Sequence, residues 1–400
     1  MRIRLKSFSI ISLSVVILIM SIFLIPESSN VVMKYGSRIL FFISAFLYMI
    51  LRRIRVRSAH VLWSIAFSAV CVLNVLFAEN RAPAVDVMKT ALQAIWIGFF
   101  FVYWISDSRR YSFFFHVVLL CSFLYCFRIL LYLPTIRWGL RKVSYMLGTN
   151  VNSIGFRLAI ACLIALYCYY RSKTKSRYIY LLLSLVYTAF ILITGSRRAF
   201  LLIILAYAVF PLAMSKDLNK RLKAMLVITA LVVAIFTLIM KYPPLYSIIG
   251  RRLLNALNAL FSSEPVMDTG RDAMIRRGLR LFLERPLQGW GMGNFRYVSG
   301  IDHVYSHNNY VELLFASGIP GFAAYYCWLP LATGGVRSLP KRTAEHTLCV
   351  LMILYSLIAD FFAPNYSSLL NHLLFLIPYS ALIARDLGQP PEDALERLLR

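Results

Sequence analysis

Charged residues, together with proline, glycine and asparagine, divide the chain into apolar blocks about as long as a membrane-spanning helix. A bilayer has a hydrocarbon core about 30 Å thick, so a helix that crosses it needs roughly 20 apolar residues. Twelve blocks approach this length. The predicted spans are Phe8–Ile25, Gly36–Leu51, His60–Ala78, Val87–Ile105, Tyr111–Leu133, Val151–Tyr170, Tyr178–Thr194, Ala199–Met214, Ala224–Met240, Ile319–Gly335, Glu345–Phe361 and Leu370–Ala384.

Composition supports a polytopic membrane protein and excludes a water-soluble enzyme. Of the 400 residues, 60% are hydrophobic and only 15% are charged, whereas soluble domains carry roughly 25% charged residues. Lipid offers no hydrogen-bond partner to the backbone, and the alternating pattern of a barrel is missing, so we expect an all-α fold. The predicted divisions are spans one to nine (1–240), an extracytoplasmic loop with amphipathic helices (241–306), a half-helix with spans ten to twelve (307–384), and a cytoplasmic tail (385–400).

The net charge of +26 at first suggests a nucleic-acid binder. The lysines and arginines instead punctuate apolar blocks, so we predict no nucleic-acid partner. Short cytoplasmic loops of membrane proteins retain Lys and Arg. The basic loops alternate accordingly, for example at Arg52–Arg57, Arg171–Arg177 and Lys216–Lys223. We therefore expect both termini in the cytoplasm.

The long loop Lys241–Ser306 carries basic residues on the opposite, outer side. Eight of its nine basic residues are arginine, whose planar fork binds phosphate oxygens two at a time. Contact with lipid head groups is the alternative interpretation. Thr269–Asp272 resembles a capping box and predicts an amphipathic helix at the outer membrane interface, ending before Pro286. Arg271 lies in its first turn, where the helix end favours an anion, and Arg277 on this helix is a further candidate.

Two shorter features also lie on the outer side. The tight turn Thr194–Arg198 carries Arg197 and Arg198 on the outer side, although Lys and Arg are normally retained in short loops on the cytoplasmic side. This exception indicates either an anion site or arginines that reach lipid head groups. Gly289–Gly293 encloses a tryptophan. Because no strand precedes it and no nucleotide is expected outside the cytoplasm, we interpret it as an interfacial turn and not a nucleotide cradle.

The segment Ser306–Gly321 predicts a short helix that is broken at Gly318 and at Pro320–Gly321. Such broken helices occur at membrane depth only within protein or beside a cavity. His307 stands at the helix start, while Asn308 and Glu312 share one helix face and are supporting candidates. A histidine with an unperturbed pKa of about 6.5 can accept the proton of an attacking hydroxyl. A purely structural role for His307 is the alternative.

Four motifs in this order resemble the O-antigen ligase and polymerase superfamily: Ser196-Arg197, Gly270-Arg271, the segment Arg285–Phe295, and His307–Gly321. The segment Gly148–Gly155 is also similar to the entry of a middle span in the polymerases. The resemblance is good over Thr194–Gly321. In the first 190 residues only the predicted membrane spans resemble the family.

The resemblance implies a GT-C-like membrane glycosyltransferase in the inner (cytoplasmic) membrane of a bacterium, with its active site facing outward. It implies that His307 is catalytic and that Arg197 and Arg271 hold the diphosphate, with inversion and without metal or cofactor. Arg198 stands where the family often has glycine, so which arginine of that pair binds stays open. Expected partners are an undecaprenyl-diphosphate-linked oligosaccharide, the lipid bilayer, and chain-length regulator and flippase proteins.

We favour a repeat-unit polymerase that extends the non-reducing end of a lipid-linked oligosaccharide. The first alternative is a ligase that transfers the glycan to lipid A core or protein. The second is a transporter or flippase for an anionic lipid-linked glycan, although the sequence shows no internal repeat of the kind many transporters have.

Overall fold

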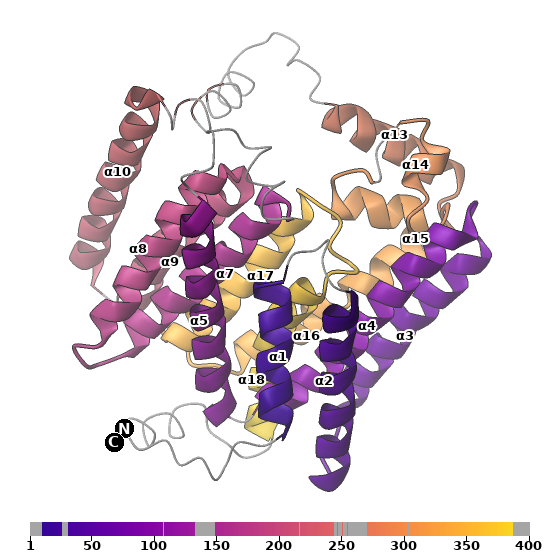
Figure 1. Ribbon diagram of the computed structural model, residues 1–400, viewed down its shortest axis with the longest axis horizontal. Coiled ribbons are helices and arrows are strands. Elements are labelled where there is room, and N and C mark those ends of the chain that lie inside the picture. The colour runs from indigo at the N-terminus through magenta and orange to yellow at the C-terminus, as the bar shows by residue number, and fades with distance from the viewer. Residues whose placement is uncertain are drawn as a thin grey trace.

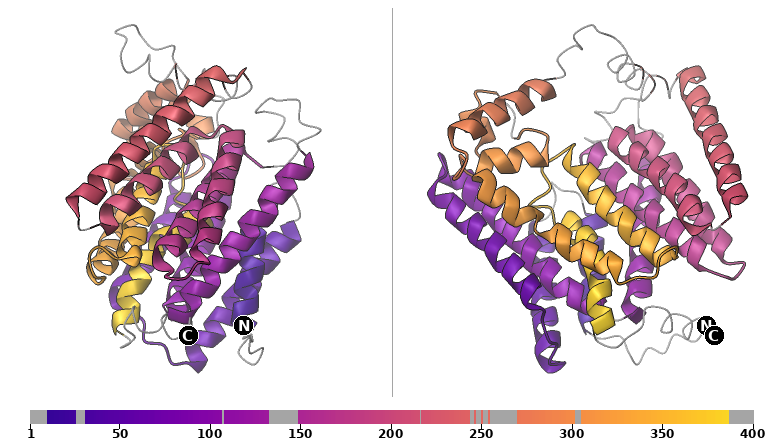
Figure 2. Two further views of the ribbon diagram at one scale, coloured as in Figure 1. Left: turned by 90° about the vertical axis from the view of Figure 1, so that its left-hand side faces the viewer. Right: turned by 180° about the vertical axis from the view of Figure 1, so that it is seen from behind.

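The computed structural model describes residues 10–25, 31–106, 108–132, 149–215, 217–243, 246, 250, 254, 270–301 and 305–386. Across these ranges the regular elements are helices, and the described residues contain no strand. Figures 1 and 2 show the helices gathered into one bundle. They are α1 (Ile10–Phe23), α2 (Val31–Leu51), α3 (Ser58–Leu76), α4 (Arg81–Ile105), α5 (Ser108–Tyr132), α7 (Val151–Arg171), α8 (Arg177–Thr194), α9 (Arg197–Met214), α10 (Leu218–Lys241), α13 (Arg271–Glu284), α14 (Phe295–Val298), α15 (Asn309–Tyr326), α16 (Trp328–Arg337), α17 (Ala344–Asp360) and α18 (Leu369–Asp386).

Eleven of the twelve predicted spans coincide with single helices. Among the described residues, seven helices, α2 to α5 and α7 to α9, are long and apolar enough to cross a membrane, and α1 and α18 are shorter apolar helices. The fold is therefore that of an all-α polytopic membrane protein, as the apolar blocks predict.

The tenth predicted span is wrong as a single helix. The chain runs through α15 to Tyr326, and α16 begins at Trp328. Pro330 has no N–H to donate to the carbonyl of Tyr326, and a proline ring disfavours a continuous helix at that point. Two consecutive helices, α15 and α16, thus replace the predicted Ile319–Gly335 span.

The centre of the bundle is α7, which packs against α5, α8, α9 and α17. Every residue from Ile154 to Cys168 is buried. Small residues let helices approach closely in a bilayer, and Gly155 does so here. A Cβ atom at Gly155 would lie 2.6 Å from the Cβ of Ser196, so glycine is required where α7 meets the start of α9.

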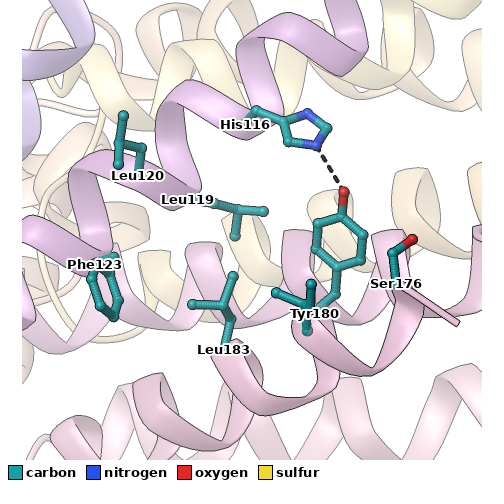
Figure 3. Close-up of a pocket in the computed structure, with 8 residues that line it drawn as sticks. His116, Leu119, Leu120, Phe123, Ser176, Tyr180 and Leu183 are labelled. Carbon is teal, nitrogen blue, oxygen red and sulfur yellow. Dashed lines mark hydrogen bonds between the residues drawn. The ribbon is translucent and has the colours of Figure 1, made fainter. Parts of the chain in front are cut away.

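The two ends of the bundle differ. At one end, hereafter the loop end, α13 and α14 lie beside α15 (Figure 1). The turn from α8 to α9 lies at this end too, because Arg197 is an electrostatic neighbour of Arg271, the first residue of α13. Toward the opposite end, the first turns of α8 and the middle of α5 border an apolar groove (Figure 3).

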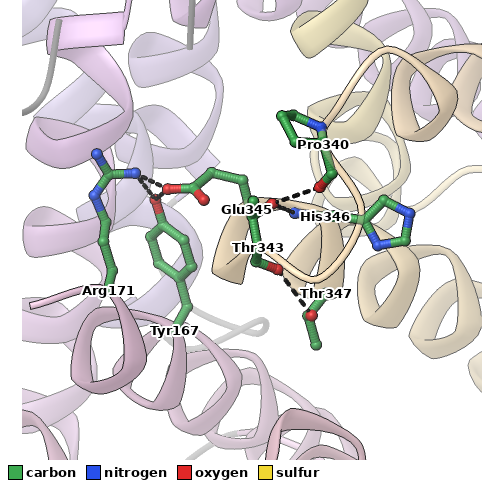
Figure 4. Close-up of polar contacts among 7 residues, drawn as sticks. All are labelled: Tyr167, Arg171, Pro340, Thr343, Glu345, His346 and Thr347. Carbon is green, nitrogen blue, oxygen red and sulfur yellow. Dashed lines mark hydrogen bonds and ion pairs between the residues drawn. The ribbon is translucent and has the colours of Figure 1, made fainter. Parts of the chain in front are cut away.

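An ion pair joins α7 to α17 at the end opposite the loop end (Figure 4). The guanidinium of Arg171 donates to Glu345 Oε1 and to the hydroxyl of Tyr167, the latter at 2.9 Å. Tyr167 donates its own hydroxyl to Glu345 Oε1 at 3.3 Å. Thr343 caps α17 by accepting the amide N–H of His346 at 3.1 Å. The contact holds the last turn of α7 against the first turn of α17.

Candidate functional site

His307 lies in a tight turn at the start of α15, and its backbone adopts a left-handed conformation. Its φ is +60°, which is uncommon for a residue other than glycine. Asn308 is the N-cap of α15, and its Oδ1 accepts the N–H of Val311 at 3.1 Å. Glu312 Oε2 reaches back and accepts the N–H of Ser306 at 2.7 Å. The two side chains therefore fix the turn from both sides.

Burial makes this turn rigid. Glu312 is 1% exposed and Ser306 is fully buried. The hydroxyl of Ser306 donates to the carbonyl of Asn308 at 3.0 Å. A residue in an unfavourable backbone conformation persists only when its surroundings determine it. These hydrogen bonds supply that constraint, and they leave His307 half-buried at the edge of the turn.

Tyr305 connects His307 to the arginines. Its ring packs edge-on against the imidazole of His307, with centroids 4.5 Å apart. It is also an electrostatic neighbour of Arg271 and of Arg198. Three chain segments, from α9, α13 and the turn before α15, thus meet around one tyrosine.

Arg197 and Arg271 occupy equivalent positions on two helices. Each is the first residue of its helix, α9 and α13, where unpaired backbone N–H groups point outward. Burial and the positive charge of Arg197 lower the pKa of Arg271, and Tyr305 acts in the opposite direction. Within the described ranges neither arginine forms an ion pair with an acidic residue. Two like charges are therefore held together at two helix N-termini.

Arg198 differs from its neighbour because it is buried. It is 7% exposed, whereas Arg197 is exposed. Its Nη2 donates to the carbonyl of Asn152 at 3.2 Å, and its guanidinium carbon lies 4.4 Å from the ring centre of Phe156. It also interacts electrostatically with Asp360. These contacts tie the site to the start of α7, where the described part of the predicted Gly148–Gly155 motif lies.

Arg277 lies in a different environment from the other candidates. Its Nε donates to the carbonyl of Ser299 at 3.0 Å, and its side chain is half-buried. This hydrogen bond braces α13 against the end of α14. This hydrogen bond involves no other candidate site residue.

The helix α13 begins one residue later than the capping-box prediction. Gly270, with a φ of +69°, is the N-cap, and no side chain caps the helix; Thr269 lies outside the described residues. The helix ends at Glu284, just before Pro286, as predicted. Met274, Gly278 and Leu281 form its buried face, which packs on α15. Leu279 and Leu283 of the same helix are exposed.

The glycine-rich turn Gly289–Gly293 forms hydrogen bonds with α15 at the break in that helix. Gly318 has non-helical backbone angles, and the carbonyls of Phe315 and Ala316 accept the N–H groups of Trp290 and Gly291 at 3.0 and 2.9 Å. The N–H of Ile319 donates to the carbonyl of Pro286 at 2.8 Å. Backbone groups freed by the break thus find hydrogen-bond partners within the protein.

Glycine is necessary for this contact. A Cβ at Gly289 would lie 2.4 Å from the carbonyl of Ala316. The sequence suggests only an interfacial turn, but in the structure this turn also packs closely against α15. Asn74 of α3 joins it as well, since its Nδ2 donates to the carbonyl of Ala316 at 2.7 Å. The indole of Trp290 donates to the carbonyl of Leu281 at 2.7 Å, and Arg285 stacks on its ring.

Two groups that the sequence reasoning missed lie beside the site. One is Tyr305. The other is a buried network centred on Asp360, which accepts the Tyr326 hydroxyl at 2.8 Å and Asn365 Nδ2 at 2.9 Å. Asn309, the first residue of α15, donates to the Tyr326 hydroxyl at 3.2 Å. A carboxylate inside a predicted span is a signal of function, and this signal was available at Asp360.

The fold defines a polytopic membrane protein, and at one end of its bundle arginines cluster beside a histidine. Residues 179–326 match the family model described as O-Antigen ligase, which confirms the predicted resemblance to the O-antigen ligase and polymerase superfamily. The match runs from α8 to the end of α15 and so includes Arg197, Arg271 and His307. It indicates a membrane glycosyltransferase-like enzyme of polysaccharide biosynthesis. No curated protein matches the chain.

Proposed function

We propose that this protein is a polysaccharide repeat-unit polymerase. It transfers a glycan from undecaprenyl diphosphate to the non-reducing end of a second lipid-linked oligosaccharide. The loop end faces outward from the inner membrane of a bacterium, which agrees with the basic loops at the opposite end. Outside the cytoplasm a sugar must be activated on a lipid carrier, and the bilayer delivers that carrier to the site.

The observation that carries this proposal is the pair Arg197 and Arg271. Among the described residues no acidic side chain forms an ion pair with either arginine, and two positive charges close together are unfavourable until an anion binds between them. Helix N-termini favour the same ligand. A diphosphate offers several oxygens to two guanidinium groups. Charge grows on the diphosphate as the glycosidic bond breaks, so the arginines stabilise the transition state more than the ground state.

His307 acts as the general base in this proposal. Its neutral imidazole takes the proton from the acceptor hydroxyl as that oxygen attacks the anomeric carbon. The new carbon–oxygen bond forms while the bond to the diphosphate oxygen breaks, and undecaprenyl diphosphate leaves with the bonding electron pair. Attack opposite the leaving group inverts the anomeric carbon. The turn held by Asn308 and Glu312 positions the imidazole, and the reaction uses no metal.

Arg198 takes a supporting role. Because it is buried against Phe156 and bonded to Asn152, we assign direct diphosphate contact to Arg197 and the anchoring of the α8–α9 turn to Arg198. Arg277 braces α13 through Ser299 and keeps Arg271 in place. Chain-length regulator and flippase proteins are the partners that such a polymerase requires.

A ligase that transfers the glycan to lipid A core or protein is the second candidate, because the matching family model is described as O-Antigen ligase. The acceptor separates the two. Purified protein supplied only with the lipid-linked repeat yields a ladder of longer chains if it is a polymerase. A product that forms only after lipid A core or protein is added would refute the polymerase and favour the ligase.

A further inference from the structure

The end of the bundle away from His307 carries a groove that the proposed reaction does not use. It lies between α5 and α8, has a volume of about 350 Å³, and is open toward the surface of the bundle (Figure 3). Its apolar lining consists of Leu119, Leu120, Phe123, Ile179 and Leu183. In a bilayer these walls face hydrocarbon chains, so an apolar chain is the expected occupant of the groove.

Polar side chains are confined to one end of the groove. There His116 Nε2 and the hydroxyl of Tyr180 are hydrogen-bonded at 2.8 Å, and His116 Nδ1 lies 2.6 Å from the carbonyl of Ser112. Ser176, the N-cap residue of α8, also lines this end. His116 and Tyr180 form a hydrogen bond with each other. The rest of the groove is an apolar channel, and its polar end lies at the start of α8.

The loop that begins at this polar end is basic. Residues 171–177 read Arg-Ser-Lys-Thr-Lys-Ser-Arg, with four cations, three hydroxyls and no acid. Lys173 and Lys175 are exposed, and the hydroxyls of Thr174 and Ser176 are hydrogen-bonded to each other. Arg171 is engaged by Glu345. The exposed lysines therefore place positive charge next to an apolar channel, which is the charge pattern of an anionic lipid site.

We propose that the groove binds one acyl chain of an anionic phospholipid, with the phosphate held by Lys173, Lys175 and the hydroxyl of Thr174 between them. Apolar burial and attraction to a negative head group act together at such surfaces. This site is separate from the proposed diphosphate site, because α8, 18 residues and so about 27 Å long, lies between Ser176 and Gly195. In the proposed orientation the lipid belongs to the cytoplasmic leaflet.

Photolabelling of the full-length protein in phosphatidylcholine vesicles tests this assignment. The probe is a trace of phosphatidylglycerol with a diazirine in its acyl chain, compared with phosphatidylcholine carrying the same group. We expect the probe to label residues 116–123 and 176–183 at least fivefold more when it is phosphatidylglycerol. Leu183→Trp fills the groove and reduces this labelling at least fivefold. The matched control is Leu182→Trp, since Leu182 is 62% exposed and does not line the groove.

The charge is tested independently of the groove shape. Lys173→Gln with Lys175→Gln should reduce phosphatidylglycerol labelling to the phosphatidylcholine level. Arg52→Gln with Arg53→Gln removes the same charge from another exposed turn at this end and should leave phosphatidylglycerol labelling of the groove unchanged. The double-lysine variant keeps the groove intact, so it remains informative if Leu183→Trp does not fold.

Two results would overturn the proposal. Equal labelling by both lipids, insensitive to the lysine substitutions, would mean that ordinary surrounding lipid contacts the groove. Stronger labelling by a diazirine polyprenyl phosphate than by phosphatidylglycerol would assign the groove to a polyprenyl chain instead. Neither result bears on catalysis at the loop end, which the acceptor assay tests separately.

Discussion

Tyr305 packs edge-on against His307, with ring centroids 4.5 Å apart and an interplanar angle of 67°. The same tyrosine is an electrostatic neighbour of Arg198 and Arg271, so one side chain bridges the proposed base and the proposed anion site. An aromatic neighbour at this distance restricts the rotation of the imidazole. The proposed reaction depends on this relationship, because it requires proton transfer and leaving-group stabilisation in one location.

Replacing His307 tests its role as general base. Ala and Asn both remove the base, but Asn tolerates the positive φ of +60° found here. We expect both variants to lower the rate of chain extension by about 10²- to 10⁴-fold, the usual contribution of general acid–base catalysis. Undecaprenyl diphosphate should still compete for binding to the Asn variant. Chain extension by His307→Asn at the parental rate would refute the assignment.

Glu312 is predicted to act through the turn that carries His307. Glu312→Gln keeps an oxygen that can accept the N–H of Ser306, whereas Glu312→Ala leaves that buried N–H unsatisfied, at a cost of about 1–3 kcal/mol. We expect the Ala variant to unfold at a lower temperature and to have a lower kcat, with both properties largely restored in the Gln variant. Equal losses of kcat in both variants would mean that the carboxylate itself takes part in the reaction.

Arg197 and Arg271 are predicted to bind the diphosphate as a pair. Arg271→Ala and Arg197→Ala should each weaken inhibition by undecaprenyl diphosphate, and Arg271→Lys should restore it only in part because lysine lacks the planar fork. Arg280→Ala is the matched control, since Arg280 is an exposed arginine on the same helix. If Arg280→Ala weakened inhibition as strongly as Arg271→Ala, general surface charge would explain the effect.

The helices were predictable because burial in lipid imposes a length and a composition on each span. The break at Gly318 was also predictable, whereas the predicted break at Pro320–Gly321 is wrong, because the helix continues through both residues to Tyr326. The tenth span was mispredicted because hydropathy does not register the missing N–H of Pro330. Hydropathy identifies apolar segments and is insensitive to the hydrogen bonds that continue or interrupt them.

The site was predictable as a set of residue types but not as an arrangement. Two arginines in a short outer turn made Arg197 and Arg198 candidates, and Arg271 was a candidate because it lies in the first turn of a helix in the arginine-rich outer loop. Their different environments, exposed for Arg197 and buried for Arg198, depend on how α9 turns against α7, which one sequence does not specify. Tyr305 was missed because an aromatic residue in a loop carries no distinctive pattern. Only the tertiary contacts give it a role.

The glycine-rich turn yields the sharpest structural prediction. Gly289 and Gly300 both have positive φ, +68° and +72°, but a Cβ at Gly300 would meet nothing within 4 Å, whereas one at Gly289 would overlap the carbonyl of Ala316. Gly300→Ala should cost only the backbone strain, about 1–3 kcal/mol. Gly289→Ala adds a steric clash, so it should separate the turn from the freed carbonyls of α15 and displace His307. Thermal unfolding in detergent and chain extension measure the two effects. We expect Gly289→Ala to lower both well below Gly300→Ala, and equal effects would show that the close approach of the turn to α15 contributes nothing.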